Sequence, residues 1–301
     1  MKQDKFIEKF TNIIQPNING IKKIVDNTDN KLFTLNSTLL IVVLGTLFLT
    51  NHFNLHIIFF IMTLLISAMI YYVGTYTFKY EYHDILERDI FPKTLKILIE
   101  ESSFFTNQNL YDDAENSDIF STYEYIVASA TIKSIWDIKY ICKQREVHIS
   151  STYINVSEIH NLGSPFSKKN HGLFITIDNI NLLNSEVYIF ENNLLPSIKE
   201  ISKKIKKDFI QDRTSNDKYT VISKNLSEQS KNKVDCILNL FNRDMTMTLK
   251  DNKIYIFIKK EFTCFDANYY TDGRIPSYFD YIELLNIKNT IEQVIELIEE
   301  A

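Results

Sequence analysis

The sequence lacks the local patterns that identify an enzyme. Its 301 residues contain no Gly-x-Ser-x-Gly nucleophile motif and no glycine-rich phosphate loop between a predicted strand and a predicted helix. Active sites can assemble from residues that are distant in sequence, so a membrane-tethered enzyme stays open as an alternative. We predict no catalytic residue, no cofactor and no metal ligand from the sequence.

Cysteine is also scarce in this chain. The three cysteines, Cys142, Cys236 and Cys264, are far apart, and none belongs to a Cys-x-x-Cys pair. This usage fits a reducing compartment and excludes a metal site built from cysteines alone. We therefore predict three unpaired structural thiols.

No strong excess of charge of either sign is present. Lys and Arg number 33 against 38 Asp and Glu, which gives a net charge of −5. Proteins that bind nucleic acids in general carry basic surfaces, so this balance argues against nucleic acid as a partner.

Charged side chains are missing altogether from residues 32–78, which contain no Asp, Glu, Lys or Arg. A single helix of that length would extend about 70 Å, whereas a hydrocarbon core of about 30 Å fits two spans of about 20 residues. We predict a transmembrane hairpin with spans over Leu32–Leu49 and Leu55–Phe78 and a break at Thr50–Asn54. A buried helical hairpin in a soluble domain is the alternative.

The residues around the two spans predict their orientation. Tyrosines near the end of the second span fit an interfacial aromatic belt: Tyr71, Tyr72, Tyr76 and Tyr80. Basic residues occur only outside the hairpin: Lys22, Lys23, Lys31, Lys79, Arg88, Lys93 and Lys96. Because Lys and Arg are retained in the cytosol, we predict a multi-pass inner-membrane protein with both termini cytosolic. The apolar stretch also lacks the form of a cleavable signal peptide.

Helices are predicted on both sides of the hairpin. In Lys2–Val25, apolar residues recur at helical spacing: Phe6, Phe10, Ile13, Ile14, Ile18 and Ile21. We predict an amphipathic helix that is broken near Pro16 and packs against the helix on the other side of the hairpin; the alternative is a helix lying on the membrane surface. After the second span, a helical stalk with a kink before Pro92 is predicted.

An acidic segment follows the stalk. Asn107–Asp118 is polar and contains Asp112, Asp113 and Glu115. These three carboxylates could bind calcium, but the central Gly and closing Glu of an EF-hand loop are absent. We predict a solvated loop.

Further along, the pattern changes to strands. Short β-branched and aromatic runs are separated by polar breaks: Ile135–Cys142, Val147–Val156, Phe174–Ile177 and Val187–Phe190. They predict a meandering antiparallel sheet. A loop is predicted at Asn161–Gly172, and its flanking His160 and His171 lack a ligand partner at metal-binding spacing, so we interpret them as surface residues.

The C-terminal part predicts helices that cover this sheet. Ser197–Phe209 has the pattern of a basic amphipathic helix, whose lysines either contact anionic lipid or form a solvated face. Then follow a strand, a helix, a hairpin turning at Lys250–Lys253, and a last helix: Tyr219–Ser223, Leu226–Phe241, Met245–Leu249 with Ile254–Ile258, and Tyr281–Glu299. The fold class is therefore α+β.

With these motifs the chain resembles the bacterial domain-of-unknown-function 3137 family of two-span membrane proteins. The resemblance rests on His171-Gly172-Leu173-Phe174 with Ile177-Asp178, on Tyr219–Ser223 leading into a helix, and on Asp251–Ile256 with Phe265-Asp266. The sequence departs from the family at Glu228-Gln229-Ser230, where the family has Glu-Ala-Arg. The resemblance implies the two-span topology and a cytosolic α+β domain, and it implies no activity.

Four segments are expected: an N-terminal helix (1–31), the hairpin (32–78), the stalk and acidic loop (79–118) and the cytosolic domain (119–301). We predict that the protein is a non-enzymatic module, tethered to the lipid bilayer, that binds another protein at the membrane or a small ligand. Binding surfaces spread their free energy over apolar and aromatic contacts. Single alanine replacements of the best polar candidates should therefore leave function mostly intact: His160, His171, Asp178 and Glu228.

Overall fold

The computed structural model describes residues 7–53, 57–106, 110–117, 119, 131–155, 169–178, 186–191, 210–213, 218–223, 227–241, 245–259, 265 and 277–299. They form two compact units that divide between Thr94 and Leu95. The first unit contains the two long helices of the predicted hairpin, and the second contains a sheet with packed helices.

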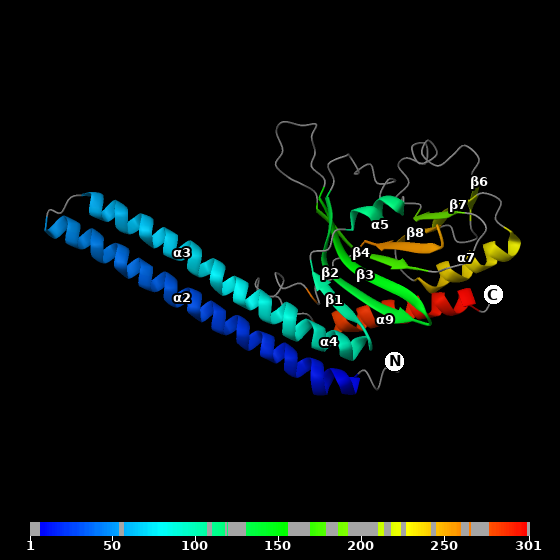
Figure 1. The fold of residues 1–301 in the computed structure, drawn as a ribbon, viewed down its shortest axis with the longest axis horizontal. Helices are drawn as coiled ribbons and strands as arrows, with labels where there is room; N and C mark the ends of the chain where they lie inside the picture. Colours follow the sequence, from blue (N-terminus) through cyan, green and yellow to red (C-terminus); the bar gives the residue numbers. More distant parts are fainter. Residues whose placement is uncertain are drawn as a thin grey trace. The chain divides into compact units, whose positions relative to one another are not determined.

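Two antiparallel helices, α2 (Gln15–His52) and α3 (Ile57–Ile85), lie side by side in the first unit (Figure 1). The backbone N–H of Phe53 donates to the Leu49 carbonyl, and α2 ends there, inside the predicted break. With their flanking turns, the helices over Ile7–His52 and Ile57–Leu98 are long and apolar enough to cross a membrane. Both therefore extend beyond the predicted spans.

Small residues of α3 face α2. Ser67 is buried, and a methyl group added at Gly74 would lie 2.7 Å from Cδ2 of Leu35. Small side chains of this kind let two apolar helices approach closely. Most of the large apolar side chains of both helices point outward and are exposed, among them Phe33, Phe48 and Tyr72.

The prediction of a helix break near Pro16 is wrong, because π-turns carry both long helices past their prolines. A five-residue π-helix, η1 (Phe10–Ile14), precedes Pro16, and another, η2 (Leu86–Ile90), precedes Pro92 and α4 (Phe91–Leu98). Proline lacks an N–H group and clashes with the carbonyl four residues earlier in an α-helix. In a π-helical turn each N–H bonds to the carbonyl five residues earlier instead of four. This change in hydrogen bonding just before each proline lets the helix continue past it.

The N-terminal apolar face is buried as predicted. Phe10, Ile14, Ile18 and Ile21 are buried, whereas Ile13 is exposed and Phe6 lies outside the described residues. The segment continues directly into α2 rather than forming a separate helix on a membrane surface.

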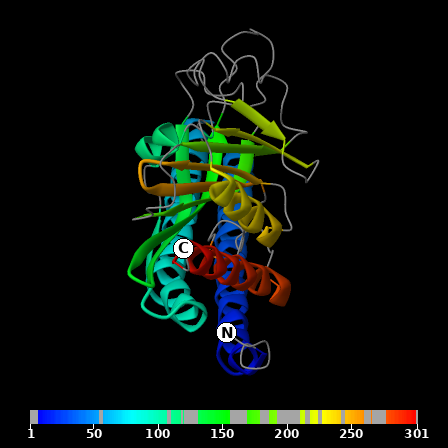
Figure 2. The same cartoon turned by 90° about the vertical axis from the view of Figure 1, so that its right-hand side faces the viewer.

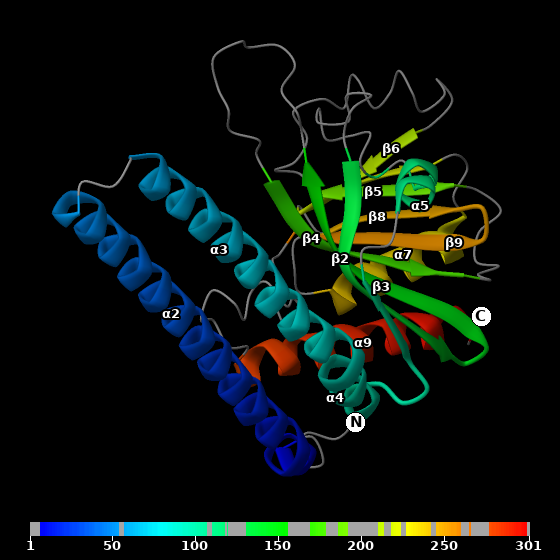
Figure 3. The ribbon, with the colours of Figure 1, turned by 60° about the vertical axis from the view of Figure 1, so that its left-hand side comes forward.

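The second unit is built on an antiparallel sheet whose described residues form nine strands in the order β1-β2-β3-β4-β9-β8-β5-β7-β6. Figure 3 labels seven of these strands: β2, β3, β4, β5, β6, β8 and β9. The strands are β1 (Ser103–Thr106), β2 (Thr131–Cys142), β3 (Arg145–Asn155), β4 (Lys169–Ile177), β5 (Val187–Glu191), β6 (Ile210–Arg213), β7 (Tyr219–Ser223), β8 (Met245–Lys250) and β9 (Lys253–Ile258). The α+β class is therefore confirmed.

The predicted meander is correct only for β2, β3 and β4. The C-terminal hairpin β8–β9 inserts between β4 and β5, where β9 pairs with β4 and β8 pairs with β5. Sequence runs predict strands but not their neighbours, since pairing is decided by which apolar faces meet. The predicted loop Asn161–Gly172 is also wrong at its end, because Lys169–Gly172 belongs to β4; residues 161–168 are not among those described.

One face of the sheet is aliphatic. A row of buried apolar residues crosses seven strands in register: Ile138, Ile149, Ile175, Ile256, Met247, Ile189 and Val221. The final helix, α9 (Tyr278–Glu299), packs on α7 (Glu228–Leu240), as Figure 2 shows. Phe265 joins α9 to this face, because its ring contacts both Trp136 and Tyr281. The last helix thus covers the sheet as predicted.

Two tight turns connect paired strands. Lys143 and Gln144 join β2 to β3, and Asp251 and Asn252 join β8 to β9, all four with positive φ. This is the backbone that matches the twist of a two-residue hairpin. The predicted turn at Lys250–Lys253 is confirmed.

The predicted loop at Asn107–Asp118 contains a short helix, α5 (Tyr111–Asn116). Leu110 and Ala114, four residues apart, are buried with Phe174, Tyr255 and Phe257 on the other face of the sheet. Asp112 and Asp113 stand in the first helical turn, where negative charge is favourable. The loop prediction fails because the packing of two apolar residues, Leu110 and Ala114, decides the conformation of this acidic segment. The basic helix predicted at Ser197–Phe209 lies outside the described residues.

Candidate functional site

Four polar side chains meet inside the sheet on the face opposite α9. Ser134 and Asp137 come from β2, and His148 and Ser150 come from β3, where Ser150 is the register partner of Asp137. We call these four residues the Asp137 cluster. A β-bulge between Ser134 and Trp136 turns Ser134 onto the same face as Asp137, although three positions separate them.

Asp137 accepts hydrogen bonds from its neighbours in the cluster. Nε2 of His148 lies 3.0 Å from Asp137 Oδ1, and the hydroxyls of Ser134 and Ser150 donate to the two carboxylate oxygens. The Asp137 side chain is fully buried and His148 is nearly so. A buried carboxylate is costly unless it is paired and hydrogen-bonded, and here all its contacts come from two adjacent strands.

The cluster contains a serine, a histidine and an aspartate, but not the geometry of a nucleophile relay. In such a relay the histidine binds the aspartate through one ring nitrogen and the serine through the other. Here the same nitrogen, His148 Nε2, lies 3.0 Å from Asp137 and 3.1 Å from Ser150 Oγ. Ser150 also donates to Asp137 directly, so the arrangement is a buried network that joins β2 to β3.

The cluster belongs to a mixed face of hydroxyls and aromatic rings. Strand register places two rows across it: His148, Thr176, Tyr255, Thr248 and Tyr188; and Asp137, Ser150, Phe174, Phe257 and Thr246. All ten side chains are buried, and the rings of Phe174 and Tyr255 stack with centroids 6.2 Å apart. The aliphatic face and the mixed face therefore differ sharply in polarity.

One hydroxyl on the mixed face is unsatisfied. Thr248 Oγ1 is buried and has no hydrogen-bond partner, and Thr248 lies between Tyr255 and Tyr188 in the strand register. A buried polar group without a partner costs about 1–3 kcal/mol. We therefore predict that Thr248→Val raises the free energy of unfolding by about 1 kcal/mol.

Thermal unfolding of the full chain in detergent, followed by fluorescence of the single tryptophan, Trp136, measures this change. The matched control is Thr246→Val, because Thr246 lies two residues earlier on the same strand and on the same face of the sheet. Thr246 takes part in a polar interaction, so its replacement should not stabilise the fold. A lower transition temperature for Thr248→Val would contradict the prediction.

Lys253, at the start of β9, forms ion pairs with Asp113 of α5 and with Asp178, the residue after β4. Lys253 Nζ lies 3.1 Å from Asp178 Oδ1 and 3.9 Å from Asp113 Oδ1. Asp112 and Glu115 are exposed on α5. The acidic residues considered for calcium are thus divided between an ion pair and solvent, and no group of three or more metal-ligating side chains occurs among the described residues.

The structure does not bring the three described polar candidates together. His171 lies half-buried in β4, and Glu228 begins α7, where it pairs with Lys231. Asp178 pairs with Lys253, and His160 lies outside the described residues. None of these residues belongs to the Asp137 cluster.

The thiols occupy ordinary positions in the fold. Cys142 is half-buried at the end of β2, Cys236 is exposed on α7, and Cys264 falls in a part that the structure does not describe. Burial raises the pKa of the Cys142 thiol and the charge of Glu292 raises it further, which outweighs the lowering by Lys288 and Lys143. A raised pKa keeps the thiol protonated and unreactive at neutral pH. Both described cysteines are unpaired.

Sequence reasoning missed the Asp137 cluster. A usable signal existed in β3, where His148 and Ser150 alternate with Val147 and Ile149, and in β2, where Asp137 is the only acid between Ile135 and Cys142. Ser134 carried no such signal, because its position on this face depends on the β-bulge.

The chain was compared with protein-family models, curated proteins and solved structures. No protein-family model and no curated protein matches the chain. A solved structure, the crystal structure of the mycobacterial trehalose monomycolate transport factor A, TtfA, is similar over 65% of this chain and 88% of that chain, with 9% sequence identity and a TM-score of 0.34. At that TM-score the similarity supports no conclusion about fold or function, and what is established is an α+β chain with two long apolar helices.

Proposed function

We propose that this chain is a two-span protein of a bacterial inner membrane that holds its α+β domain at the cytosolic surface as a binding module. The observation that carries the proposal is the exposed apolar surface of α2 and α3 between residues 32 and 78. Soluble proteins rarely expose apolar patches larger than a few hundred square ångströms. A lipid environment accounts for this surface.

The lengths of the helices agree with two spans. Residues 32–52 of α2 would extend about 31 Å and residues 57–78 of α3 about 33 Å, close to the hydrocarbon thickness of about 30 Å. Threonine hydroxyls within the spans donate to the helix's own carbonyls, as Thr46 does to Val42 and Thr63 to Phe59, whereas Thr75 Oγ1 is buried without a hydrogen-bond partner. The bonded hydroxyls therefore need no water inside a bilayer.

Charged side chains mark the end of the apolar stretch. Lys31 Nζ lies 3.8 Å from Glu81 Oε2 and 5.5 Å from the centre of the Phe78 ring. This pair joins α2 and α3 where both would leave the hydrocarbon. Basic residues occur at the two ends of the hairpin, and the connection between the spans contains no Lys or Arg. This distribution supports a cytosolic position for both termini.

A binding role for the domain is favoured over catalysis. The Asp137 cluster joins two adjacent strands, and its histidine cannot pass a proton from Ser150 to Asp137 through opposite ring nitrogens. Tethering raises the local concentration of a domain at its partner without any new contact. The partner in this proposal is a membrane-associated protein, consistent with the resemblance to two-span membrane proteins.

Cysteine labelling tests the topology. In a chain whose native cysteines are otherwise replaced, Asn51→Cys should react with a membrane-impermeant maleimide in intact spheroplasts, because residue 51 lies at the connection between the spans. A second variant that keeps the natural Cys236, exposed on α7, as its only cysteine is the control, and this cysteine should react only after lysis. Labelling of Cys236 in intact spheroplasts would reverse the topology, and recovery of the chain in the soluble fraction would refute membrane insertion.

Alanine variants test the binding role in cells. His171→Ala, Asp178→Ala and Glu228→Ala should each retain most of the function that is lost on deletion of the gene, because binding free energy is spread over many contacts. Immunoblotting confirms that each variant is as abundant as the wild type. Complete loss of function in one variant at normal abundance would instead favour an enzyme.

A further inference from the structure

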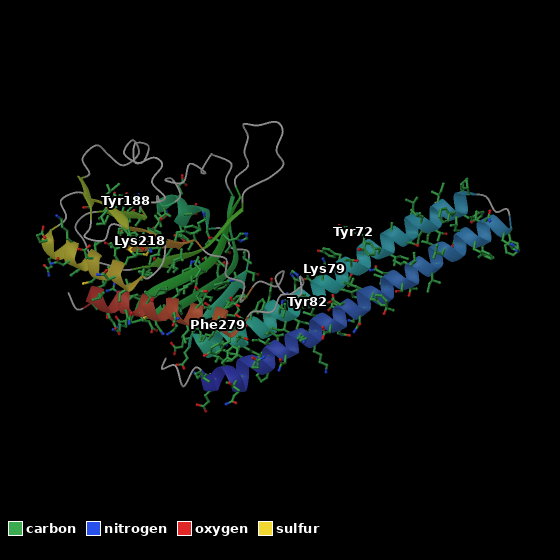
Figure 4. All side chains as sticks on the ribbon, turned by 180° about the vertical axis from the view of Figure 1, so that it is seen from behind. Tyr72, Lys79, Tyr82, Tyr188, Lys218 and Phe279 are labelled. Atoms are coloured by element: carbon green, nitrogen blue, oxygen red, sulfur yellow. The ribbon has the colours of Figure 1, made fainter. Side chains whose placement is uncertain are left out.

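Three tyrosines and a lysine form a continuous stripe along α3 at the end of its apolar stretch. Tyr72, Tyr76 and Tyr80 follow one another at intervals of four residues and expose 73%, 65% and 59% of their surface. Lys79 is also exposed beside them, and Figure 4 shows Tyr72 and Lys79 along the helix. The rings of Tyr76 and Tyr80 stack with centroids 6.4 Å apart. We call these four residues the tyrosine stripe.

The tyrosine stripe faces away from α2. Gly74 approaches Leu35, and Phe78 and Glu81 both contact Lys31, so these three residues define the side of α3 that faces α2. At 3.6 residues per turn, Tyr72, Tyr76 and Lys79 lie about half a turn from Gly74. The stripe is thus presented outward, over about 12 Å of helix at 1.5 Å per residue.

The two lysines at this level differ in their electrostatic environment. Lys31 is neutralised by Glu81 and lies against the Phe78 ring. No acidic side chain is paired with Lys79 among the described residues, and the positions three and four residues away on the helix are Thr75, Tyr76, Tyr82 and His83. Lys79 therefore carries an uncompensated positive charge among exposed phenol groups.

We propose that the tyrosine stripe is a binding site for the headgroup of an anionic phospholipid in the cytosolic leaflet; this rests on the proposed membrane insertion. The Lys79 ammonium and the hydroxyls of Tyr76 and Tyr80 donate hydrogen bonds to the phosphate oxygens, while the aromatic rings lie at the boundary of the acyl chains. A lysine near an anionic leaflet contributes about 1 kcal/mol to such binding. Lys31 contributes little, because Glu81 already compensates its charge.

The test titrates the purified full-length protein in detergent with fluorescent phosphatidylglycerol and with phosphatidylcholine of the same acyl chains. Lys79→Gln should weaken binding of phosphatidylglycerol about fivefold, which corresponds to about 1 kcal/mol. Binding of phosphatidylcholine should weaken less, because the choline ammonium compensates the charge of its phosphate. Tyr80→Phe keeps the ring and removes one donor, so it should weaken phosphatidylglycerol binding about threefold. Inorganic phosphate should not compete, because it lacks the acyl chains.

The matched control is Lys31→Gln, which removes a lysine at the same level of the hairpin and should change the affinity less than twofold. Equal affinity of Lys79→Gln and the wild type for phosphatidylglycerol would overturn the proposal. An equal loss of this affinity in Lys79→Gln and Lys31→Gln would also overturn it, because it would indicate charge attraction without a specific site. Competition by phosphate would also overturn it. If the chain fractionates as a soluble protein, the membrane proposal itself fails; if it is integral but Lys79→Gln has no effect, only the lipid site fails.

Discussion

Replacement of Asp137 by alanine is expected to lower the free energy of unfolding by about 3–5 kcal/mol. The carboxylate is fully buried and accepts hydrogen bonds from Ser134, His148 and Ser150. Its removal takes away the acceptor that these three buried groups share, and each hydrogen bond lost inside the sheet carries a desolvation cost. Fluorescence of Trp136, which is fully buried next to Asp137 on β2, reports the loss of the fold during thermal or chemical unfolding.

Asp112→Ala is the matched control for this change. Asp112 is an exposed carboxylate on α5, so its removal should shift stability by no more than about 0.5 kcal/mol. The double variant with His148→Ala should be less destabilised than the sum of the two single changes, since the two residues share a hydrogen bond. If the free energy of unfolding of Asp137→Ala lies within 1 kcal/mol of the wild-type value, the network does not stabilise the β2–β3 pair.

Gly172→Ala is expected to destabilise the sheet by about 1–3 kcal/mol through overpacking. A Cβ atom at Gly172 would lie 2.4 Å from the ring of Phe257 and 2.7 Å from the carbonyl oxygen of Ile258. The ring lies over Gly172 from the neighbouring strand β9, and the backbone oxygen cannot move away without breaking the pairing of β4 with β9. The same unfolding measurement on Trp136 checks this result.

Two further variants separate crowding from other effects. Phe257→Leu makes room above residue 172. The double variant Gly172→Ala with Phe257→Leu should therefore lose less stability than the sum of the losses in the two single variants. Gly20→Ala adds the same methyl group in helix α2 where nothing lies within 4 Å, and it should not destabilise the chain. Equal stability of Gly172→Ala and the wild type would show that the sheet adjusts without cost.

Most regular elements of the chain could be predicted from its sequence, because their apolar periodicity is local. The charge-free segment gave the two long helices, β7 was predicted at its observed residues, and the β8–β9 turn follows from two residues with positive φ. The first strand, β1 (Ser103–Thr106), was missed, because four residues hold too little pattern to distinguish a strand from a loop. The helix α5 was missed because its apolar contacts lie on distant strands.

The candidate site shows the same limit more clearly. Asp137, His148 and Ser150 stand in strands that periodicity predicts, yet their convergence depends on the pairing of β2 with β3, and the addition of Ser134 depends on a β-bulge. None of the residues singled out as polar candidates from local motifs, such as His171 and Glu228, belongs to this cluster. Local motifs report chemistry within a few residues, whereas this network joins side chains up to sixteen positions apart.

The sequence by itself determined the α+β class, the long apolar hairpin and the order of most strands and helices. These features depend on the spacing of apolar and charged residues along one segment at a time, and such spacing can be read without knowing what the segment contacts. Only the tertiary structure decided that β8 and β9 lie between β4 and β5, that π-turns carry the helices past Pro16 and Pro92, and that Asp137 is buried among hydrogen-bond donors. These outcomes depend on which surfaces meet when the chain folds, because strand pairing and burial are contacts between residues far apart in the sequence.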